Sequence, residues 1–278
     1  SAMKKGSAKR ERAGADIIGP KTPEITIRKP PSYTGPTATN MTSKTDSASN
    51  SSRSTETAME VSGLAFSWDP VQPRLSFPDI ILKRGEHLFL HGPSGSGKST
   101  LLSLLAGMLR PASGTVRVLG TDIHRLGAGA RDQFRADHMG VIFQQFNLVP
   151  YLSTRANVTL PCGLSELRRE RTEPTVEDEA ERLLAALSIP ADHWQRKVTR
   201  LSIGQQQRIA AARALIGAPG LILADEPTSA LDADNRDRFL ELLLTLAHRH
   251  NTSVLFVSHD QSLARHFDNQ LELQGDRT

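Results

Sequence analysis

Residues 92–100 read GPSGSGKST, which fits the pattern G-x-x-x-x-G-K-[ST]. A short apolar run, residues 88–90, precedes this stretch, and a leucine-rich segment with helical character, residues 101–109, follows it. Strand, glycine-rich loop and helix in this order are the context in which the pattern indicates a phosphate-binding loop. The competing interpretation is a Gly/Ser-rich turn without a ligand, which the flanking strand and helix disfavour.

The composition of this loop suits phosphate binding. A backbone wraps closely around phosphate oxygens only where side chains are absent, which explains Gly92, Gly95 and Gly97. Lys98 is placed to reach the β- and γ-phosphates, and the Ser99 hydroxyl has the position that binds Mg²⁺. The residues expected to bind the nucleotide here are Gly92, Pro93, Ser94, Gly95, Ser96, Gly97, Lys98, Ser99 and Thr100.

A second stretch, residues 221–227, reads LILADEP, an apolar run that ends in Asp225 and Glu226. Such a run indicates a central parallel strand, and open α/β sheets bind ligands at the carboxyl ends of their strands. We expect Asp225 to hold Mg²⁺ and Glu226 to orient and deprotonate the water that attacks the γ-phosphate. Adjacent acids at a strand end ordinarily lie in a solvated turn, but the phosphate loop favours a catalytic pair. The two stretches predict an ATPase with an α/β fold.

A third stretch, residues 201–208, reads LSIGQQQR and resembles the signature region of ATP-binding cassette (ABC) ATPases. The resemblance implies that two such domains stack head to tail, so that each ATP lies between the phosphate loop of one copy and the signature of the other. Ser202, Gly204 and Gln205 are then expected to contact ATP from the second copy, at the positive end of a helix. The commonest signature has glycine where this chain has Ile203, which requires an ordinary local backbone conformation and could lower turnover.

The same resemblance implies roles for residues elsewhere in the chain. Gln144 matches the Q-loop glutamine, which contacts Mg²⁺ and the attacking water, and His259 matches the switch histidine that touches the γ-phosphate. Asp232 matches the D-loop, which crosses to the second copy, and Trp68 matches the ring that stacks on adenine, with Phe66 as the alternative. Taken alone, each has a plain structural interpretation as a loop, surface or core residue. The expected catalytic residues are Glu226, His259, Gln144 and Lys98, and the expected metal ligands are Ser99, Gln144 and Asp225.

The resemblance also implies the architecture. The expected fold is a P-loop NTPase core, a mainly parallel sheet with helices on both faces, together with an antiparallel β subdomain and an α-helical subdomain. We place the ABC ATPase domain at residues 59–278 and its helical subdomain at about 146–217, where leucines recur along one face of a charged helix. The stretch FNLVP at residues 146–150 most resembles the branch that contains lipoprotein-releasing and macrolide-export ATPases and the related cell-division ATPase.

The N-terminal segment differs in composition from the rest. Residues 1–58 carry ten Lys or Arg and five Asp or Glu, against 34 and 30 in all 278 residues, so the net charge is +5 in this segment and −1 in the remainder. Few large apolar residues occur in it, which predicts a disordered, basic, Ser/Thr/Pro-rich tail. Residues 1–3 resemble a cleavage scar. A basic cluster near the start could contact anionic lipid or nucleic acid, but a solvated tail is the favoured interpretation.

Composition constrains the cellular setting. No apolar run approaches the ~20 residues that a membrane span requires. The single cysteine, Cys162, forbids an internal disulfide, suits a reducing cytoplasm and is expected to be a packing residue. Together with these features, the resemblance implies a cytoplasmic protein that lies at the inner face of the cell membrane through its partner.

Three functions remain open at this level. The favoured one is the ATP-hydrolysing subunit of a membrane ABC transporter or mechanotransmission complex, which binds ATP and Mg²⁺, pairs with a second copy and drives an integral membrane permease-type subunit. The second is a soluble ABC ATPase acting on nucleic acid or ribosomes, and nucleic acid is disfavoured because the chain has neither fused cassettes nor a long coiled-coil insertion. The third is a low-turnover nucleotide switch.

Overall fold

The structure is a computed structural model that describes residues 56–69 and 74–274. Five of its strands form a parallel sheet in the order β10-β4-β9-β8-β7. Their bounds are β4 His87–His91, β7 Met139–Ile142, β8 Leu221–Asp225, β9 Ser253–Val257 and β10 Asn269–Glu272. These strands are short apolar runs because both faces of a parallel sheet are covered by other elements.

Alternation along the strands divides their side chains between two cores. Phe89, Ile222 and Phe256 belong to one core, whereas their neighbours Leu90 and Leu223 belong to the other. A period of two residues sends successive side chains to opposite faces of a sheet, so the parallel sheet separates the two cores. The carboxyl ends of β4, β7, β8 and β9 consequently meet at one edge, where the polar loops gather.

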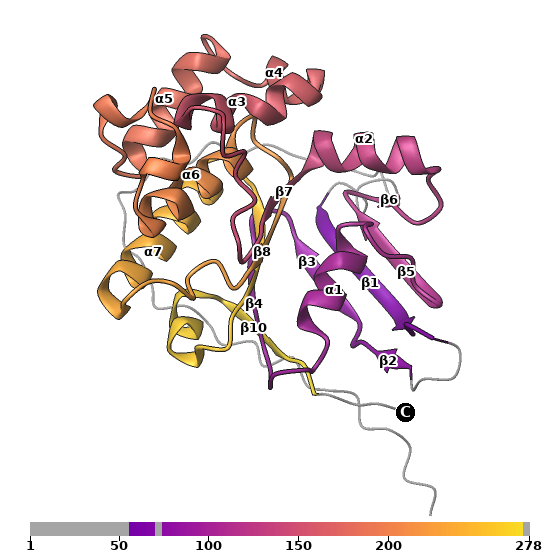
Figure 1. Cartoon of the computed structure of the whole chain (residues 1–278). Helices are drawn as coiled ribbons and strands as arrows, with labels where there is room; N and C mark the ends of the chain where they lie inside the picture. The colour runs from indigo at the N-terminus through magenta and orange to yellow at the C-terminus, as the bar shows by residue number, and fades with distance from the viewer. Residues whose placement is uncertain (1–55, 70–73, 275–278) are drawn as a thin grey trace, which may run out of the picture.

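A second, antiparallel sheet lies on one side of the parallel sheet, on the right in Figure 1. Its strands are β1 Thr57–Phe66, β2 Leu75–Ser76, β3 Ile80–Lys83, β5 Ser113–Val118 and β6 Thr121–Asp122. The central strand β1 pairs with β2, β3 and β5. Helix α1, Lys98–Leu105, has four buried leucines and shares its core with this sheet, so it lies between the two sheets.

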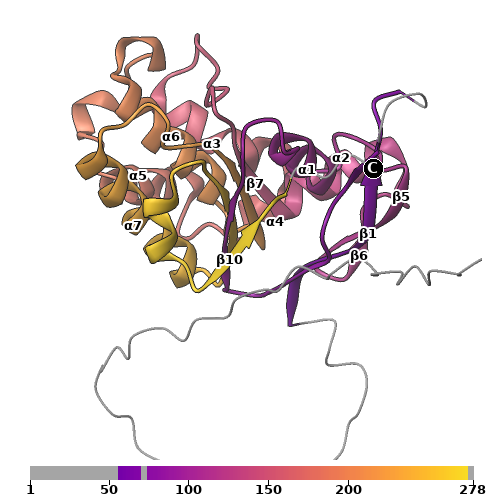
Figure 2. The same ribbon diagram turned by 90° about the horizontal axis from the view of Figure 1, so that it is seen from below.

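The remaining helices lie mostly on the opposite side, and both views place α3, α5, α6 and α7 away from the antiparallel sheet (Figures 1 and 2). The α-helices are α2 Ala128–His138, α3 Thr154–Leu164, α4 Glu166–Glu170, α5 Val176–Ala186, α6 Ile203–Leu215 and α7 Ala233–Arg249. Short 3-10 helices are η1 Ala191–His193, η2 Val198–Arg200 and η3 Gln261–His266. Leu183, Leu184 and Leu187 are buried, as their spacing predicts.

This architecture confirms the predicted fold class of a parallel sheet with an antiparallel subsheet and flanking helices. Of the predicted tail, residues 1–55 lie outside the described residues, and β1 already begins at Thr57. Among the helices of residues 56–69 and 74–274, none combines the length and the apolar character needed to cross a membrane. Cys162 is buried, and burial raises the pKa of its thiol, which fits a packing residue.

Candidate active site

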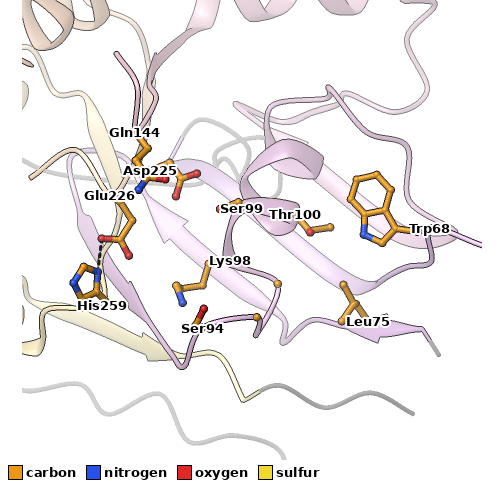
Figure 3. A pocket seen from close by; sticks show the side chains of 12 residues that line it. Trp68, Leu75, Ser94, Lys98, Ser99, Thr100, Gln144, Asp225, Glu226 and His259 are labelled. Atoms are coloured by element: carbon orange, nitrogen blue, oxygen red, sulfur yellow. Dashed lines mark hydrogen bonds and ion pairs between the residues drawn. The ribbon is translucent and has the colours of Figure 1, made fainter. Parts of the chain in front are cut away.

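The expected site residues converge on a cleft of about 460 Å³. It opens at the edge where the parallel strands end and α1 begins, with Trp68 at one end and His259 at the other (Figure 3). Its lining residues are Trp68, Leu75, Ser94, Gly95, Gly97, Lys98, Ser99, Thr100, Gln144, Asp225, Glu226 and His259.

The loop between β4 and α1 has a backbone that only glycine adopts easily. Gly95 and Gly97 have φ of 82° and 91°, in the left-handed region. A Cβ at Gly95 would meet nothing within 4 Å, whereas one at Gly92 would lie 2.4 Å from the Leu273 carbonyl oxygen. Gly95 therefore serves the backbone turn, and Gly92 serves the packing of the loop against the chain after β10.

The amino end of α1 offers backbone donors to an anion. Its N-cap residue is Gly97, which has no side chain to accept from the first N–H groups, and its first turn contains no acidic residue. The first four N–H groups of an α-helix have no partner within the helix. These donors and the positive end of the helix suit a phosphate group.

Lys98 already lies over this loop. Its Nζ donates to the carbonyl oxygens of Gly92 at 2.8 Å and Pro93 at 2.9 Å. An ammonium has three donors, so one is left for a phosphate oxygen. The loop thus holds the charge of Lys98 in place beside the amino end of α1.

Asp225, at the carboxyl end of β8, has the properties of a metal ligand. Burial raises the pKa of its carboxyl group, while the neighbouring Ser99 hydroxyl and Lys98 ammonium lower it. Within the part of the chain that the structure describes, its buried Oδ1 has no hydrogen-bond partner. A buried carboxylate oxygen without a donor is costly unless a cation meets it. The donor set of Ser99, Asp225 and the side-chain oxygen of Gln144 is all oxygen, which fits Mg²⁺.

Glu226 has an unusual backbone conformation, with φ of 46°. A non-glycine residue in this region costs about 1 kcal/mol or more and is held there by its surroundings. The Glu226 N–H donates to the Val257 carbonyl oxygen at 3.0 Å, which fixes the turn. The resulting geometry points the carboxylate into the cleft, where Oε2 lies 2.8 Å from Nδ1 of His259 (Figure 3).

The end of the cleft beyond α1 carries the aromatic ring expected to meet the base. Trp68 is 65% exposed and lines the cleft together with Leu75, whereas Phe66 is only 7% exposed. The two rings meet edge to face with their centroids 4.9 Å apart. Of the two candidates, Trp68 is therefore the one that faces the cleft, and Phe66 supports it from the core.

Comparison with known proteins agrees with this geometry. A family model described as ABC transporter matches residues 77–229. The chain belongs to the ABC transporter ATP-binding family. The uncharacterized ABC transporter ATP-binding protein YbbA of Escherichia coli K12 is 41% identical over 197 residues, which cover 70% of this chain and 83% of YbbA. The lipoprotein-releasing system ATP-binding protein LolD of Shewanella frigidimarina is 38% identical over 200 residues, or 72% of this chain and 82% of LolD.

A solved structure of an ATP-binding cassette also resembles this chain. A dimeric structure of the ATP-binding cassette MJ0796 in a post-hydrolysis state, bound to ADP and Pi, has a TM-score of 0.67 and 30% identity. The match covers 78% of this chain and 94% of that chain. Membership of this family confirms the predicted ATPase activity coupled to transport, and the similarity to LolD confirms the expected branch.

The signature residues of this ABC ATPase do not line its own cleft. Ser202 is the N-cap of α6, where its hydroxyl accepts from the Gln205 N–H at 3.3 Å while the Gln205 side chain accepts from the Ser202 N–H at 3.0 Å. Ile203 is the first residue of the helix and 56% exposed, and it has an ordinary helical conformation. A Cβ at Gly204 would lie 3.3 Å from the Leu231 side chain, so α6 begins against the 229–232 turn.

Four other predicted residues also lie outside the lining of the cleft. Asp232 is the N-cap of α7 and accepts from the backbone N–H and the side-chain amide of Asn235, which lower the pKa of its carboxyl group. Gly92, Pro93 and Ser96 belong to the phosphate loop without lining the cleft, and Ser96 is buried. Leu75, which does line it, was missed because a lone leucine in a two-residue strand carries no sequence signal.

Proposed function

We propose that this ABC ATPase works as a homodimer that encloses two ATP molecules and drives an integral membrane permease-type partner. The observation that carries this proposal is the separation of two halves of one site. The cleft holds the phosphate loop, Asp225 and Glu226, whereas the amino end of α6 with Ser202 is exposed and lies outside the lining of that cleft. A second copy is needed to bring such a helix end to the γ-phosphate.

The cleft residues divide the work of binding. Loop N–H groups and Lys98 would hold the phosphates, and Trp68 would stack on the adenine ring. Ser99, Gln144 and Asp225 would hold Mg²⁺, which neutralises charge on the β- and γ-phosphates.

Hydrolysis would rest on Glu226 and His259. The carboxylate accepts a proton from water as the water attacks the γ-phosphorus, and the bond to ADP breaks. His259 lies 2.8 Å from that carboxylate and has an exposed ring, so its other nitrogen would be free to contact the γ-phosphate. Loss of the terminal phosphate removes the group that both copies share, so the dimer opens.

A second hollow supports a membrane partner. It has a volume of about 630 Å³, lies among α2, α3, α4 and β7, and is lined largely by apolar side chains including Phe143, Leu160 and Leu164. Phe143 lines this hollow, and the next residue, Gln144, lines the cleft. A partner bound in the hollow would therefore contact the residue adjacent to one that lines the ATP site. We assign the hollow and the helical subdomain, about residues 146–217, to a cytoplasmic helix of the permease-type subunit, which would hold the ATPase at the inner face of the membrane.

Hydrolysis by Glu226 is tested by Glu226→Gln, which keeps the shape of the side chain and removes its basicity. The rate of hydrolysis should fall at least about a hundredfold while ATP binding persists. Glu241→Gln, an exposed change on α7, serves as the matched control. Unchanged hydrolysis in Glu226→Gln would refute the assignment of the base, and a parent protein with hardly any turnover would favour a nucleotide switch instead.

The assignment of the hollow is tested by Leu164→Asp, at a side chain that is 64% exposed. The isolated variant should hydrolyse ATP at the parental rate but should no longer co-purify with the membrane subunit in detergent. Retention of the membrane subunit by the variant would place the partner elsewhere.

A further inference from the structure

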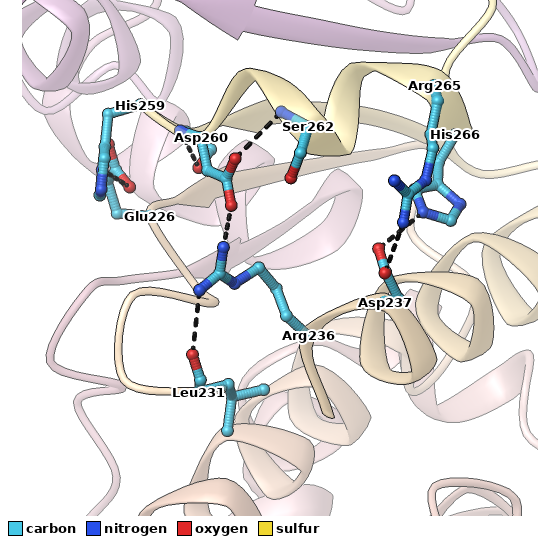
Figure 4. A network of polar contacts seen from close by, with 10 residues as sticks. Glu226, Leu231, Arg236, Asp237, His259, Asp260, Ser262, Arg265 and His266 are labelled. Atoms are coloured by element: carbon cyan, nitrogen blue, oxygen red, sulfur yellow. Dashed lines mark hydrogen bonds and ion pairs between the residues drawn. The ribbon is translucent and has the colours of Figure 1, made fainter. Parts of the chain in front are cut away.

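Two consecutive residues of α7 hold the segment that follows His259. Arg236 pairs with Asp260 at the start of η3, and Asp237 accepts from Arg265 and pairs with His266 at its end (Figure 4). The charges alternate, because the Arg236 cation of α7 faces the Asp260 carboxylate and the Asp237 carboxylate of α7 faces the Arg265 cation. Both ends of η3 are therefore joined to α7, directly after the loop that carries His259.

Asp260 is held on three sides. Its Oδ2 accepts from Arg236, its Oδ1 accepts from the Ser262 N–H at 3.0 Å, and its own N–H donates to the Ser258 hydroxyl at 3.1 Å. His259, by contrast, is largely exposed at its side chain and bonds to Glu226. The position of the His259 ring therefore depends on Glu226 and on the backbone on either side of it, one side of which Asp260 anchors.

The same guanidinium also reaches the turn that follows β8. Arg236 Nη2 donates to the Leu231 carbonyl oxygen at 3.1 Å, while Nη1 bonds to Asp260. Arg236 therefore ties the 229–232 turn to the His259 loop, although these loops follow different strands. A guanidinium can serve two acceptors at once in a fixed geometry, whereas a lysine ammonium lacks that fork.

Leu231 extends this connection to the signature helix. Its side chain lies 3.3 Å from where a Cβ of Gly204 would be, at the first turn of α6. Leu231 thus lies beside the amino end of α6, and Arg236 bonds both to Leu231 and to Asp260. Asp260 directly follows His259 in the chain, and His259 bonds to Glu226.

We propose that Arg236 is a positioning residue that couples the amino end of α6 to the Glu226–His259 pair of the same chain. The inference rests on the proposed homodimer, in which that end of α6 faces the ATP held by the other copy. When the amino end of α6 binds the ATP of the other copy, the adjacent 229–232 turn would be held in one conformation. Arg236, which bonds to this turn and to Asp260, would then hold the His259 loop in its active position as well. Each cleft would therefore hydrolyse its ATP only when α6 of the same chain is bound to the ATP in the cleft of the other copy.

The test compares Arg236→Ala with Arg238→Ala, a control on the exposed face of the same helix. Arg236→Ala should lower kcat about tenfold while leaving the affinity of a single copy for a fluorescent ATP analogue within about twofold. In the Glu226→Gln background, where ATP is not consumed, it should raise several-fold the protein concentration needed for half-maximal ATP-promoted dimerisation. Arg236→Lys keeps the charge but not the forked geometry, so its kcat and its dimerisation should lie between those of the parent and Arg236→Ala. Because this change is conservative, it also shows whether the effect of Arg236→Ala is merely a failure to fold.

Two results would overturn the coupling. Parental kcat and dimerisation in Arg236→Ala would show that Arg236 transmits nothing. A lower kcat with parental dimerisation would make Arg236 a local support of His259 alone. Absence of any ATP-promoted dimer in Glu226→Gln itself is a different outcome, because it would refute the proposed homodimer before Arg236 is changed.

Discussion

Nδ1 of His259 lies 2.8 Å from Oε2 of Glu226, although the two residues are 33 positions apart in the sequence. Their proximity follows from the pairing of β8 with β9, whose register sets Asp225 opposite Val257. The next residues of both strands therefore leave the sheet side by side. An ionised carboxylate only accepts hydrogen bonds, so with Glu226 in that form this contact is a hydrogen bond donated by Nδ1 of His259.

His259→Ala removes this contact. Because Glu226 would lose the group that orients its carboxylate, we expect kcat to fall about a hundredfold, with ATP affinity little changed. Steady-state phosphate release together with equilibrium ATP binding measures both effects. His250→Ala, at the exposed end of α7, is the control. A variant of His259 with parental kcat would remove the histidine from the mechanism.

Asp225→Asn tests the metal ligand set. The amide keeps the shape of the side chain but loses the charge that would meet Mg²⁺ at the buried Oδ1. We expect the Mg²⁺ concentration for half-maximal hydrolysis to rise at least about tenfold, measured by titrating MgCl₂ at saturating ATP. Asp192→Asn, in an exposed ion pair with Arg196, should leave it unchanged. An unchanged Mg²⁺ requirement in Asp225→Asn would contradict the assignment.

Trp68→Ala tests the adenine contact. Stacking of a base on an aromatic ring is worth about 1–3 kcal/mol, so the Kd for ATP should rise roughly tenfold while kcat at saturation stays close to parental. The chain has two tryptophans, and Trp194→Phe leaves Trp68 as the sole indole. Its fluorescence should then change when ATP is added. No change in fluorescence or in Kd would place the adenine away from Trp68.

Local patterns predicted the parts of the site that lie within single loops. Lys98 and Ser99 follow from the glycine-rich loop, and Asp225 and Glu226 follow from an apolar run that ends in acids. Their meeting in one cleft could also be anticipated, because parallel strands end at the same edge of a sheet.

Contacts between distant segments could not be predicted in this way. Arg236 and Asp260 are 24 positions apart, and nothing in either local sequence marks them as partners. Ser202 and Asp232 were placed at the nucleotide by resemblance, whereas the structure describes them as caps of α6 and α7 outside the cleft lining. A capping residue lies at an exposed helix end. The same side chain can therefore cap its own helix and also contact a nucleotide that is bound to the other copy.

Stability should depend on pH through His87, which lies buried at the start of β4. Burial lowers its pKa from 6.5 to about 4, with a smaller contribution from His248. The unfolded chain therefore binds a proton that the folded chain excludes as pH falls from about 6.5 to about 4. Between pH 7.5 and pH 5, this should reduce the free energy of unfolding by about 2 kcal/mol.

Urea denaturation at these two pH values measures the effect. In His87→Leu the difference between pH 7.5 and pH 5 should shrink by about 2 kcal/mol, because the substituted residue binds no proton. An equal pH dependence in the parent and in His87→Leu would show that other groups are responsible.

The shared nucleotide site is tested most directly by the mass of the Glu226→Gln protein in light scattering, with ATP or with ADP present. The account predicts a single copy of 30.3 kDa with ADP and twice that mass with ATP and Mg²⁺. The doubling should disappear when Ser202 is also changed to a bulky acidic residue, Ser202→Glu, because the helix end would then repel the phosphate. A mass that stays at one copy with saturating ATP would contradict a site built from two copies.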